Sequence, residues 1–330
     1  MPTRPSTPVL DVVELTKNYG HRDRVVHAVD HVSFRIERGE TLALVGESGS
    51  GKSSAARSIL HMPPPTSGQV LLNGHDLGQM SSRDLRATRA DIQMVFQNPY
   101  GSLNPRWPLH ELITEPLVLR KVGDRIQRRR RADELLALVG LEPGRFAERR
   151  AGQLSGGQAQ RVAIARALAL SPAVVIFDEA LSALDVSIRA QILNLLAEIQ
   201  RDIGLTSLFI GHDLAVVRHI SDRVGVMYLG RIVELADVDD LYAGPAHPYT
   251  AALLDAVPEP HGEPGRPTHL PQGEPPNPAK PPSGCHFHPR CPRASQRCAD
   301  EVPQLRHVAG RDVACHHPLT LADPSDVTPA

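Results

Sequence analysis

The chain has 330 residues, with 36 basic and 37 acidic side chains, 41% hydrophobic residues and a net charge of −1. This length predicts about two domains, or one large domain with an extension, because single hydrophobic cores rarely grow beyond about 250–300 residues. The balanced charge argues against a general nucleic-acid binder, which normally carries a basic excess.

Two residue types are concentrated near the C-terminus. All four cysteines fall between Cys285 and Cys315, and 16 of the 30 prolines lie from Pro258 onward. A chain that lacks cysteine through its first 284 residues is not a disulfide scaffold. We therefore expect the C-terminal part to be structurally distinct from the rest of the chain.

The sequence lacks the features of a membrane-spanning or exported chain. No apolar run approaches the roughly 20 residues that cross a bilayer. The stretch Met1–Pro5 is polar and contains two prolines, unlike the apolar centre of a signal peptide. We expect a cytoplasmic protein that reaches a membrane only through a partner.

Short apolar runs alternate with helical stretches, which is the pattern of an α/β domain with a largely buried sheet. The expected strands are residues 9–15, 28–36, 41–45, 70–72, 92–96, 173–177, 206–210 and 223–228. The expected helices are residues 52–61, 155–170, 186–203 and 213–220.

The alternation changes character in two places. Between Asn98 and Arg150 the pattern is helical and highly charged, which predicts a helical insertion. Its run Arg128–Arg131 is read as a solvated helix face rather than a nucleic-acid patch, because no other basic cluster accompanies it. After Leu235 the pattern weakens, and the 12 prolines of Pro258–Pro292 predict an extended connector.

A phosphate-binding loop follows the strand expected at 41–45. The eight residues from Gly46 to Ser53 fit the pattern G-x-x-x-x-G-K-[S/T] and open a helix, which is the context that the motif requires. Glycines let backbone N–H groups surround phosphate, Lys52 adds a positive charge, and the Ser53 hydroxyl is placed to bind Mg²⁺. The predicted nucleotide-binding residues here are Gly46, Glu47, Ser48, Gly49, Ser50, Gly51, Lys52, Ser53 and Ser54.

A second site is expected where the apolar strand 173–177 meets two carboxylates. A strand buried on both faces tolerates ionised groups only at its tip. Asp178 is expected to bind Mg²⁺ and Glu179 to polarise the attacking water. The alternative is that both acids cap the next turn, but the phosphate-binding loop in the same chain favours the catalytic interpretation.

A third motif, residues 154–158, begins the helix that precedes this strand. A serine and two glycines at a helix N-terminus form a second anion-binding surface. With this motif the chain strongly resembles the ATP-binding cassette (ABC) ATPases from about Val9 to Pro258. In that family the motif, here Ser155, Gly156, Gly157 and Gln158, completes the nucleotide site of the partner subunit.

The resemblance implies roles for further residues. Tyr19 corresponds to the adenine-stacking aromatic, and Gln97 to the glutamine that senses Mg²⁺ and contacts the membrane partner. Ser182–Asp185 corresponds to the D-loop at the dimer interface, and His212 to the histidine that contacts the γ-phosphate. Alone, Tyr19 reads as an ordinary surface aromatic and His212 as a strand-end histidine. The family usually has proline after the catalytic glutamate, whereas this chain has Ala180-Leu181.

The mechanism that the resemblance implies is a head-to-tail dimer that encloses two ATP molecules. ATP closes the dimer and hydrolysis releases it, through the differential affinity of ATP for the closed state. Stretches 96–106, 184–191 and 247–250 resemble the second, F-type ATPase subunit of bacterial dipeptide, oligopeptide and nickel importers. The implied partners are a different ATPase subunit, two membrane permeases and an extracytoplasmic binding protein, at the cytoplasmic face of the inner membrane.

The four cysteines suggest a second cofactor. Four thiolates in an otherwise thiol-free chain point to one four-ligand metal centre, and such sulfur sites suit zinc or iron–sulfur. The absence of C-x₂-C pairs weakens the zinc-ribbon interpretation, and free thiols remain an alternative. Similar clusters in the importer family hold [4Fe–4S], which implies the ligands Cys285, Cys291, Cys298 and Cys315. Nearby histidines are expected to cover the site.

The expected fold is therefore α/β: a P-loop ABC ATPase core with an antiparallel β part and a helical insertion, plus a Pro/Cys-rich extension. The expected boundaries are 1–97 and 151–235 for the core, 98–150 for the helical subdomain and 236–330 for the C-terminal extension. A soluble ABC ATPase acting on nucleic acid is the alternative, although the long coiled coil or second cassette of such proteins is absent here. A P-loop kinase or GTPase leaves residues 154–158 unexplained.

Overall fold

A computed structural model describes residues 7–21, 24–256, 273–274 and 276–319. The chain divides into two compact units. The first comprises the described residues up to Asp11, Arg35–Thr41 and Leu71–Ile210. The second comprises Val12–Phe34, Leu42–Val70 and the described residues from Gly211 onward. Much of the expected connector, residues 257–272 and 275, lies outside the described ranges.

The first unit holds a parallel strand trio and most of the helices. Its strands are β5 (His75–Asp76), β6 (Ile92–Phe96), β7 (Val174–Asp178) and β8 (Ser207–Ile210). Its α-helices are α2 (Ser82–Thr88), α3 (Leu109–Leu119), α4 (Arg125–Leu138), α5 (Pro143–Phe146), α6 (Gly156–Ala167) and α7 (Val186–Ile203). Short 3₁₀ turns are η1 (Leu77–Gln79), η2 (Pro99–Gly101), η3 (Ala151–Gln153) and η4 (Leu168–Leu170).

The strand β7 lies between β6 and β8, and both pairings are parallel. Every residue of β7 is buried, as its unbroken apolar run predicts. The register places Phe96 opposite Asp178 and Asp178 opposite Ile210. The carboxyl ends of the three strands therefore lie together, which is where parallel sheets place functional side chains.

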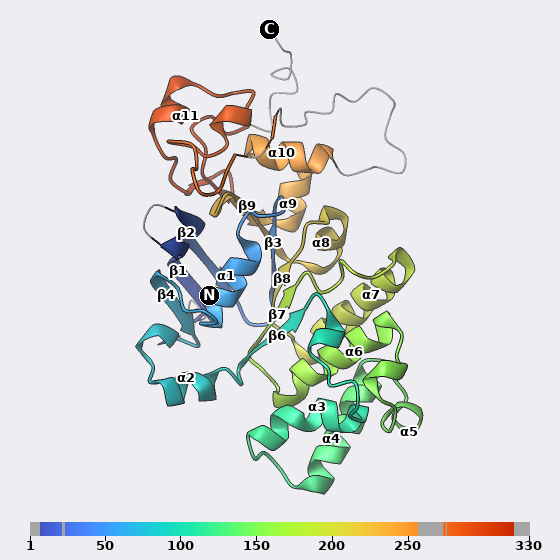
Figure 1. The fold of residues 1–330 in the computed structure, drawn as a ribbon. Coiled ribbons are helices and arrows are strands. Elements are labelled where there is room, and N and C mark those ends of the chain that lie inside the picture. Colours follow the sequence, from blue (N-terminus) through green and yellow to red (C-terminus); the bar gives the residue numbers. More distant parts are fainter. Residues whose placement is uncertain (1–6, 22–23, 257–272, 275, 320–330) are drawn as a thin grey trace, which may run out of the picture. The chain divides into compact units, whose positions relative to one another are not determined.

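The helical insertion expected between Asn98 and Arg150 is confirmed by α3, α4 and α5. The helices α3, α4 and α6 pack against one another (Figure 1). Each contributes apolar residues at helical spacing, such as Leu109, Leu112 and Ile113 of α3. This packing gives α6 a rigid base.

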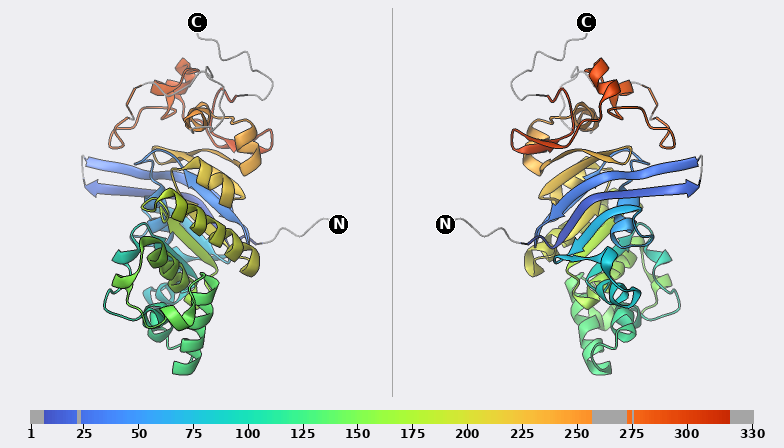
Figure 2. Two further views of the ribbon diagram at one scale, coloured as in Figure 1. Left: turned by 90° about the vertical axis from the view of Figure 1, so that its right-hand side faces the viewer. Right: turned by 90° about the vertical axis from the view of Figure 1, so that its left-hand side faces the viewer.

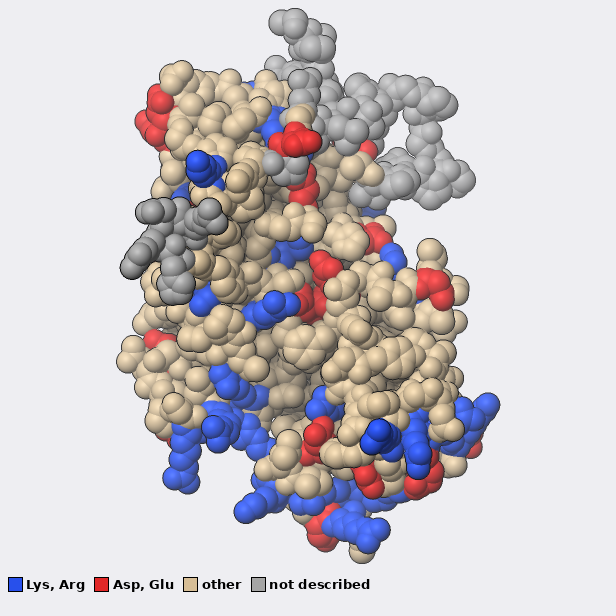
Figure 3. Space-filling model, viewed as in Figure 1, with Lys and Arg blue, Asp and Glu red and all other residues tan. Residues whose placement is uncertain are grey.

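The arginine run of α4 is a charged surface with acidic partners, as expected. Arg129 pairs with Asp133 and Glu148, and Arg130 pairs with Glu134. Figure 3 shows basic side chains gathered over α2 and over α3–α5, with acidic side chains among them. Such exposed pairs contribute at most about 1 kcal/mol each and mainly keep the surface solvated.

The second unit holds strands of two sheets and the C-terminal elements. Its strands, with their full bounds, are β1 (Leu10–His21), β2 (Arg24–Ile36), β3 (Thr41–Val45), β4 (Ser67–Leu72), β9 (Arg223–Tyr228), β10 (Arg231–Asp237), β11 (Arg306–Val308) and β12 (Arg311–Val313). Its helices are α1 (Lys52–Ile59), α8 (Leu214–Ile220), α9 (Val238–Ala243), α10 (Pro248–Asp255), α11 (Gln296–Asp300) and the 3₁₀ turn η5 (His288–Arg290).

The C-terminal strands are built into the sheet that contains β3 and β9. The strand β9 pairs in parallel with β3 and antiparallel with β10, and β12 then pairs antiparallel with β10 and β11. Figures 1 and 2 show the red C-terminal segment beside α10. The strands β11 and β12 thus extend the sheet that contains β9 and β10, and the sequence pattern does not predict them. Each has three residues, too few to show an alternating pattern.

The expected strands and helices are otherwise confirmed, with shifted ends in several cases. The predicted bounds of β3, β6, β9 and α7 match those observed. The long neighbouring strands β1 and β2 are visible in Figure 2. Of the helices in the described ranges, none combines the length and the apolar character that crossing a bilayer requires.

Candidate nucleotide-binding site

The phosphate-binding loop connects β3 to α1. At two of its positions another part of the backbone lies so close that only glycine fits. A Cβ atom on Gly46 would lie 2.2 Å from the Met227 carbonyl oxygen, and one on Gly51 would lie 2.0 Å from that of Ala28. Both glycines also have positive φ, 148° and 105°. The loop therefore has the tight backbone that a phosphate cradle needs.

The side chain of Lys52 lies inside this loop and is only 4% exposed. Its Nζ donates to the carbonyl oxygens of Gly46 and Glu47, at 2.8 and 2.9 Å, and to Ser50 Oγ at 3.1 Å. A buried ammonium needs such hydrogen bonds to offset its desolvation. The Lys52 ammonium is thus held inside the loop by the loop's own carbonyl oxygens.

The loop residue Glu47 makes contacts with the C-terminal part of the second unit. Its backbone N–H donates to Tyr249 Oη at 2.9 Å. Its carboxylate accepts from Arg290, with Nη1 at 3.0 Å from Oε2 and Nη2 at 3.2 Å from Oε1. Burial raises the pKa of Tyr249, so the hydroxyl stays protonated. No local sequence pattern predicts either partner of Glu47.

In the first unit, the two predicted acids lie at the end of β7. Asp178 is 6% exposed. Glu179 follows with φ 49°, a left-handed conformation that is uncommon outside glycine, and its N–H donates to Ile210 O at 3.0 Å. Backbone strain of this kind concentrates at functional sites. The conformation turns the chain sharply directly after Asp178.

The turn after Glu179 is closed although the usual proline is absent. Both the N–H and the hydroxyl of Ser182 donate to the Glu179 carbonyl, at 3.1 and 2.8 Å. Ala180 and Leu181 are buried. The amide Nε2 of Gln97 donates to Ser182 Oγ at 3.0 Å. The first unit thus brings Gln97 to the turn that carries Glu179.

The predicted anion-binding motif forms the N-terminus of α6. Ser155 and Gln158 make a reciprocal capping box: Gln158 N–H donates to Ser155 Oγ at 3.4 Å, and Ser155 N–H donates to Gln158 Oε1 at 3.1 Å. A Cβ atom on Gly157 would lie 2.5 Å from Ile188 Cγ2 of α7. Ser155 is exposed, as a surface that completes a partner's site requires.

The remaining predicted residues have less distinctive surroundings. Asp185 caps α7, because its carboxylate accepts from Ile188 N–H at 3.0 Å, and this bond lowers the Asp185 pKa. His212 is exposed and follows Gly211, whose N–H donates to Leu44 O of β3 at 3.2 Å. Tyr19 lies on β1, is 36% exposed, and has Lys17 Nζ 5.3 Å from its ring centroid.

The predicted site residues therefore form two groups. Gly46–Ser54, Tyr19 and His212 belong to the second unit, and Gln97, Asp178, Glu179 and the α6 motif belong to the first.

The four cysteines are free thiols in one segment of the second unit, and burial raises the pKa values of Cys291 and Cys315 to about 11 and about 12. Cys315 packs with Ala246 and Val313. Four thiols suit zinc or iron–sulfur as donors. Over the described residues, however, no three His, Cys, Asp or Glu side chains converge as metal ligands. The four thiols are therefore not arranged as a ready-made metal site in this structure.

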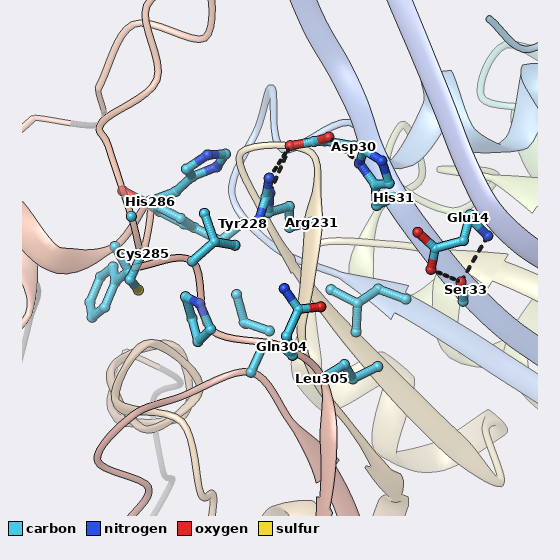
Figure 4. A pocket seen from close by; sticks show the side chains of 17 residues that line it. Glu14, Asp30, His31, Ser33, Tyr228, Arg231, Cys285, His286, Gln304 and Leu305 are labelled. Carbon is cyan, nitrogen blue, oxygen red and sulfur yellow. Dashed lines mark hydrogen bonds and ion pairs between the residues drawn. The ribbon is translucent and has the colours of Figure 1, made fainter. Parts of the chain in front are cut away.

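A cavity of about 510 Å³ lies next to the cysteine segment (Figure 4). Cys285 and His286 line one side, and the strands β1, β2 and β10 line another. Its polar side chains pair with one another: Arg231 lies 2.7 Å from Asp30 Oδ2, and Ser33 Oγ donates to Glu14 at 3.1 Å. The loop Gly46–Ser53 does not line it, so this cavity is separate from the nucleotide-binding residues.

Two family models match the chain: "ABC transporter" over residues 29–182, and "Oligopeptide/dipeptide transporter, C-terminal region" over residues 233–298. A probable peptide ABC transporter ATP-binding protein of Sinorhizobium fredii, y4tS, is 51% identical over 94% of this chain and 90% of its own length. The chain belongs to the ATP-binding proteins of the ABC peptide-importer family. The di/tripeptide transport ATP-binding protein DppF of Pseudomonas aeruginosa is 48% identical, over 94% of this chain and 97% of that protein.

Solved structures of ABC ATPases agree with this assignment. The ATP-binding cassette MJ0796, a dimer in a post-hydrolysis state with ADP and Pi, has a TM-score of 0.62 and 33% identity. It covers 69% of this chain and 98% of that structure. The cbiO1 subunit from Clostridium perfringens has a TM-score of 0.65 and 31% identity, over 72% of this chain and 91% of that one. This ABC ATPase is thus the ATP-hydrolysing subunit of a membrane importer.

Proposed function

We propose that this ABC ATPase binds and hydrolyses MgATP with the residues of the two groups described above, and that the transported cargo is a peptide. The observation that supports the nucleotide site most is the loop from Gly46 to Lys52. Two glycines without room for a Cβ and a lysine held at the centre of the loop leave backbone N–H groups and a positive charge for phosphate.

Each residue then has a defined task. Lys52 exchanges its loop carbonyl partners for β- and γ-phosphate oxygens. Glu179 orients and polarises the attacking water, and His212 contacts the γ-phosphate. Ser53, Gln97 and Asp178 offer the oxygen donors that Mg²⁺ prefers, and the ion neutralises phosphate charge when bound. Tyr19 stacks on adenine.

The α6 motif completes the site of a second subunit. Ser155, Gly156, Gly157 and Gln158 present an exposed helix N-terminus, which attracts the γ-phosphate of ATP bound to the partner. Asp185 holds the D-loop at the same interface. We propose a heterodimer with a different ABC ATPase subunit, in which this chain is the F-type member. The similarity to the relatives DppF and AppF supports the choice of the F-type member.

The relatives also support the assignment of cargo and partners. They include a di/tripeptide transport protein and the oligopeptide transport protein AppF of Bacillus subtilis, which is 51% identical over 88% of this chain. We propose that the dimer docks on two membrane permeases at the cytoplasmic face of the inner membrane and that an extracytoplasmic binding protein delivers the peptide. Residues 1–97 and 151–235 form the ATPase core in this proposal, 98–150 the helical subdomain and 236–330 the importer-type extension.

We propose further that Cys285, Cys291, Cys298 and Cys315 hold a [4Fe–4S] cluster rather than zinc. The support is the donor set of four thiols, which this cluster requires. Anaerobic purification of the full chain is expected to yield a brown protein with about four iron atoms and four sulfides per chain. A colourless protein with one zinc per chain would replace the cluster by zinc.

The substitution Glu179→Gln tests the catalytic assignment. The variant is expected to bind ATP as tightly as the unchanged protein but to lose at least about 100-fold in turnover, because the amide cannot polarise water. It is also expected to accumulate as a closed dimer with ATP bound, visible by size-exclusion chromatography. Unchanged turnover would refute the role of Glu179, and lost ATP binding would place this residue in the nucleotide pocket instead.

A further inference from the structure

The loop residue Glu47 is held by two side chains from the C-terminal part of the chain. Tyr249 is 202 residues away in sequence and accepts the Glu47 backbone N–H. Arg290 is 243 residues away and donates to both oxygens of the Glu47 carboxylate. Neither contact belongs to the phosphate-binding motif itself, and both join the same residue.

The Tyr249 hydroxyl is fixed by a buried network. The side chain is fully buried at the start of α10, and its ring lies 4.6 Å from that of Tyr228, centroid to centroid. The Tyr249 N–H donates to His247 Nδ1 at 3.0 Å, and the His247 N–H donates to Glu234 Oε2 at 2.9 Å. Glu234 is itself buried. The hydroxyl therefore has little freedom to follow Glu47 if the loop moves.

The Arg290 guanidinium is similarly constrained. The side chain is 8% exposed and the Glu47 side chain 27% exposed, so water screens this ion pair only weakly. Arg290 Nη1 also lies 3.3 Å from Tyr228 Oη. Phe287, three residues earlier, packs its ring 5.3 Å from the rings of both Tyr228 and Tyr249. Tyr249 thus belongs to an aromatic cluster with Tyr228 and Phe287, and Arg290 contacts the same cluster through Tyr228.

The position of Glu47 matters because its backbone carbonyl accepts a hydrogen bond from Lys52 Nζ. With the N–H directed to Tyr249 and the carboxylate to Arg290, the carbonyl of the same residue lies 2.9 Å from Lys52 Nζ. Rotation of the Glu47 backbone would move this acceptor and displace the lysine. The contacts from the C-terminal part therefore act on the loop at the point where the ammonium is held.

We propose that Arg290 and Tyr249 are positioning residues for ATP binding, which act through Glu47 to hold the phosphate-binding loop in its nucleotide-ready form. The C-terminal segment is in this way a part of the ATP site. The proposal rests on the proposed function only in taking Gly46–Ser54 as the nucleotide loop.

The test compares ATP affinity of the full-length chain across a double-mutant cycle. Arg290→Gln is expected to weaken ATP binding about tenfold, the effect of losing a charge-assisted pair. Glu47→Gln is expected to do the same, and the double variant to bind no more weakly than either single one. Arg290→Lys is expected to restore part of the affinity. Additive losses in the double variant would overturn the proposal.

Controls separate positioning from loss of folding. Arg297→Gln removes an exposed ion pair with Glu301 in the same segment and is expected to leave ATP affinity unchanged. Tyr249→Phe keeps the buried ring and is expected to weaken ATP binding about threefold. Tyr242→Phe loses a hydroxyl bond that is donated to Leu214 O and not to Glu47, and it is expected not to weaken ATP binding. Equal losses in Tyr249→Phe and Tyr242→Phe would contradict the proposal.

The KM and kcat of ATP hydrolysis distinguish a positioning role from a loss of folding stability. In the assembled transporter, Arg290→Gln is expected to raise KM for ATP about tenfold while kcat at saturating ATP stays within about twofold. A fall in kcat with unchanged KM would overturn the positioning role. If the unchanged protein does not bind ATP, or if Lys52→Ala binds it normally, the assignment of the loop itself fails, which is a separate outcome.

Discussion

The helices α1 and α6 both begin at a glycine-rich turn suited to phosphate, but different parts of the chain stabilise the two N-termini. In α6, Ser155 and Gln158 cap the helix with their own hydrogen bonds. In α1 the N-cap is Gly51, which has no side chain, and the preceding loop is held by Tyr249 and Arg290. The cap of α6 is local, which suits its proposed role toward a partner subunit, whereas the loop before α1 depends on distant residues.

The two N-termini should differ most in their contribution to ATP affinity, because Lys52 of α1 has no equivalent in the motif 154–158. Lys52→Ala is expected to weaken ATP binding by the full-length chain about 100-fold or more, because the phosphates lose a charge-assisted bond in a buried loop. Equilibrium titration with ATP measures this. Unchanged affinity would contradict the assignment of Gly46–Ser54 as the nucleotide-binding loop.

The buried support of the loop should weaken in acid. His247 is fully buried, and burial lowers its pKa from 6.5 to about 3. Below pH 6.5 the unfolded chain therefore binds a proton that the folded chain does not, so stability falls as the pH decreases from about 6.5 to about 3. The loss from this group is about 1.4 kcal/mol per pH unit, or about 2 kcal/mol between pH 6.5 and 5.

Urea unfolding of the unchanged protein and of His247→Asn at both pH values isolates this contribution. The variant keeps an acceptor for the Tyr249 N–H but does not titrate in this range. Its stability is expected to fall by about 2 kcal/mol less over the same pH interval. Identical pH dependence in the two proteins would show that His247 takes up its proton in the folded state.

The smallest effect is expected at the locally capped helix. Ser155→Ala removes one exposed capping bond and should lower the free energy of unfolding by about 0.5–1 kcal/mol. ATP affinity of the isolated chain should not change, whereas turnover of the assembled transporter should fall because the partner's γ-phosphate loses a contact. Weaker ATP binding by the isolated chain would contradict the division of labour between α1 and α6.

The features that can be predicted from the sequence are those that, like the cap of α6, are formed by neighbouring residues. The motif 154–158, the loop Gly46–Ser53 and the strand ending at Asp178 were readable because each places its chemistry within a few residues. The bounds of β3 and α7 followed from unbroken apolar or helical patterns. These features depend on local propensity and burial, which the sequence reports directly.

The support of the loop could not be predicted in this way. Residues 247–250 show only a stretch that resembles the importer family, and Arg290 lies between two cysteines without a motif of its own. Their contacts with Glu47 join residues more than 200 positions apart, and no periodicity encodes such a pairing. The strand β12 was missed for the same reason, since its partner β10 is distant and its own length is three residues.

The central claim is that the C-terminal segment holds the phosphate-binding loop. Amide hydrogen exchange of the nucleotide-free, full-length protein tests it most directly, with Arg290→Gln compared to the unchanged chain. Peptides covering Gly46–Lys52 are expected to exchange about tenfold faster in the variant, while peptides covering 154–160 exchange at the same rate. Equal rates in the loop, or equal acceleration at both helix N-termini, would contradict the claim.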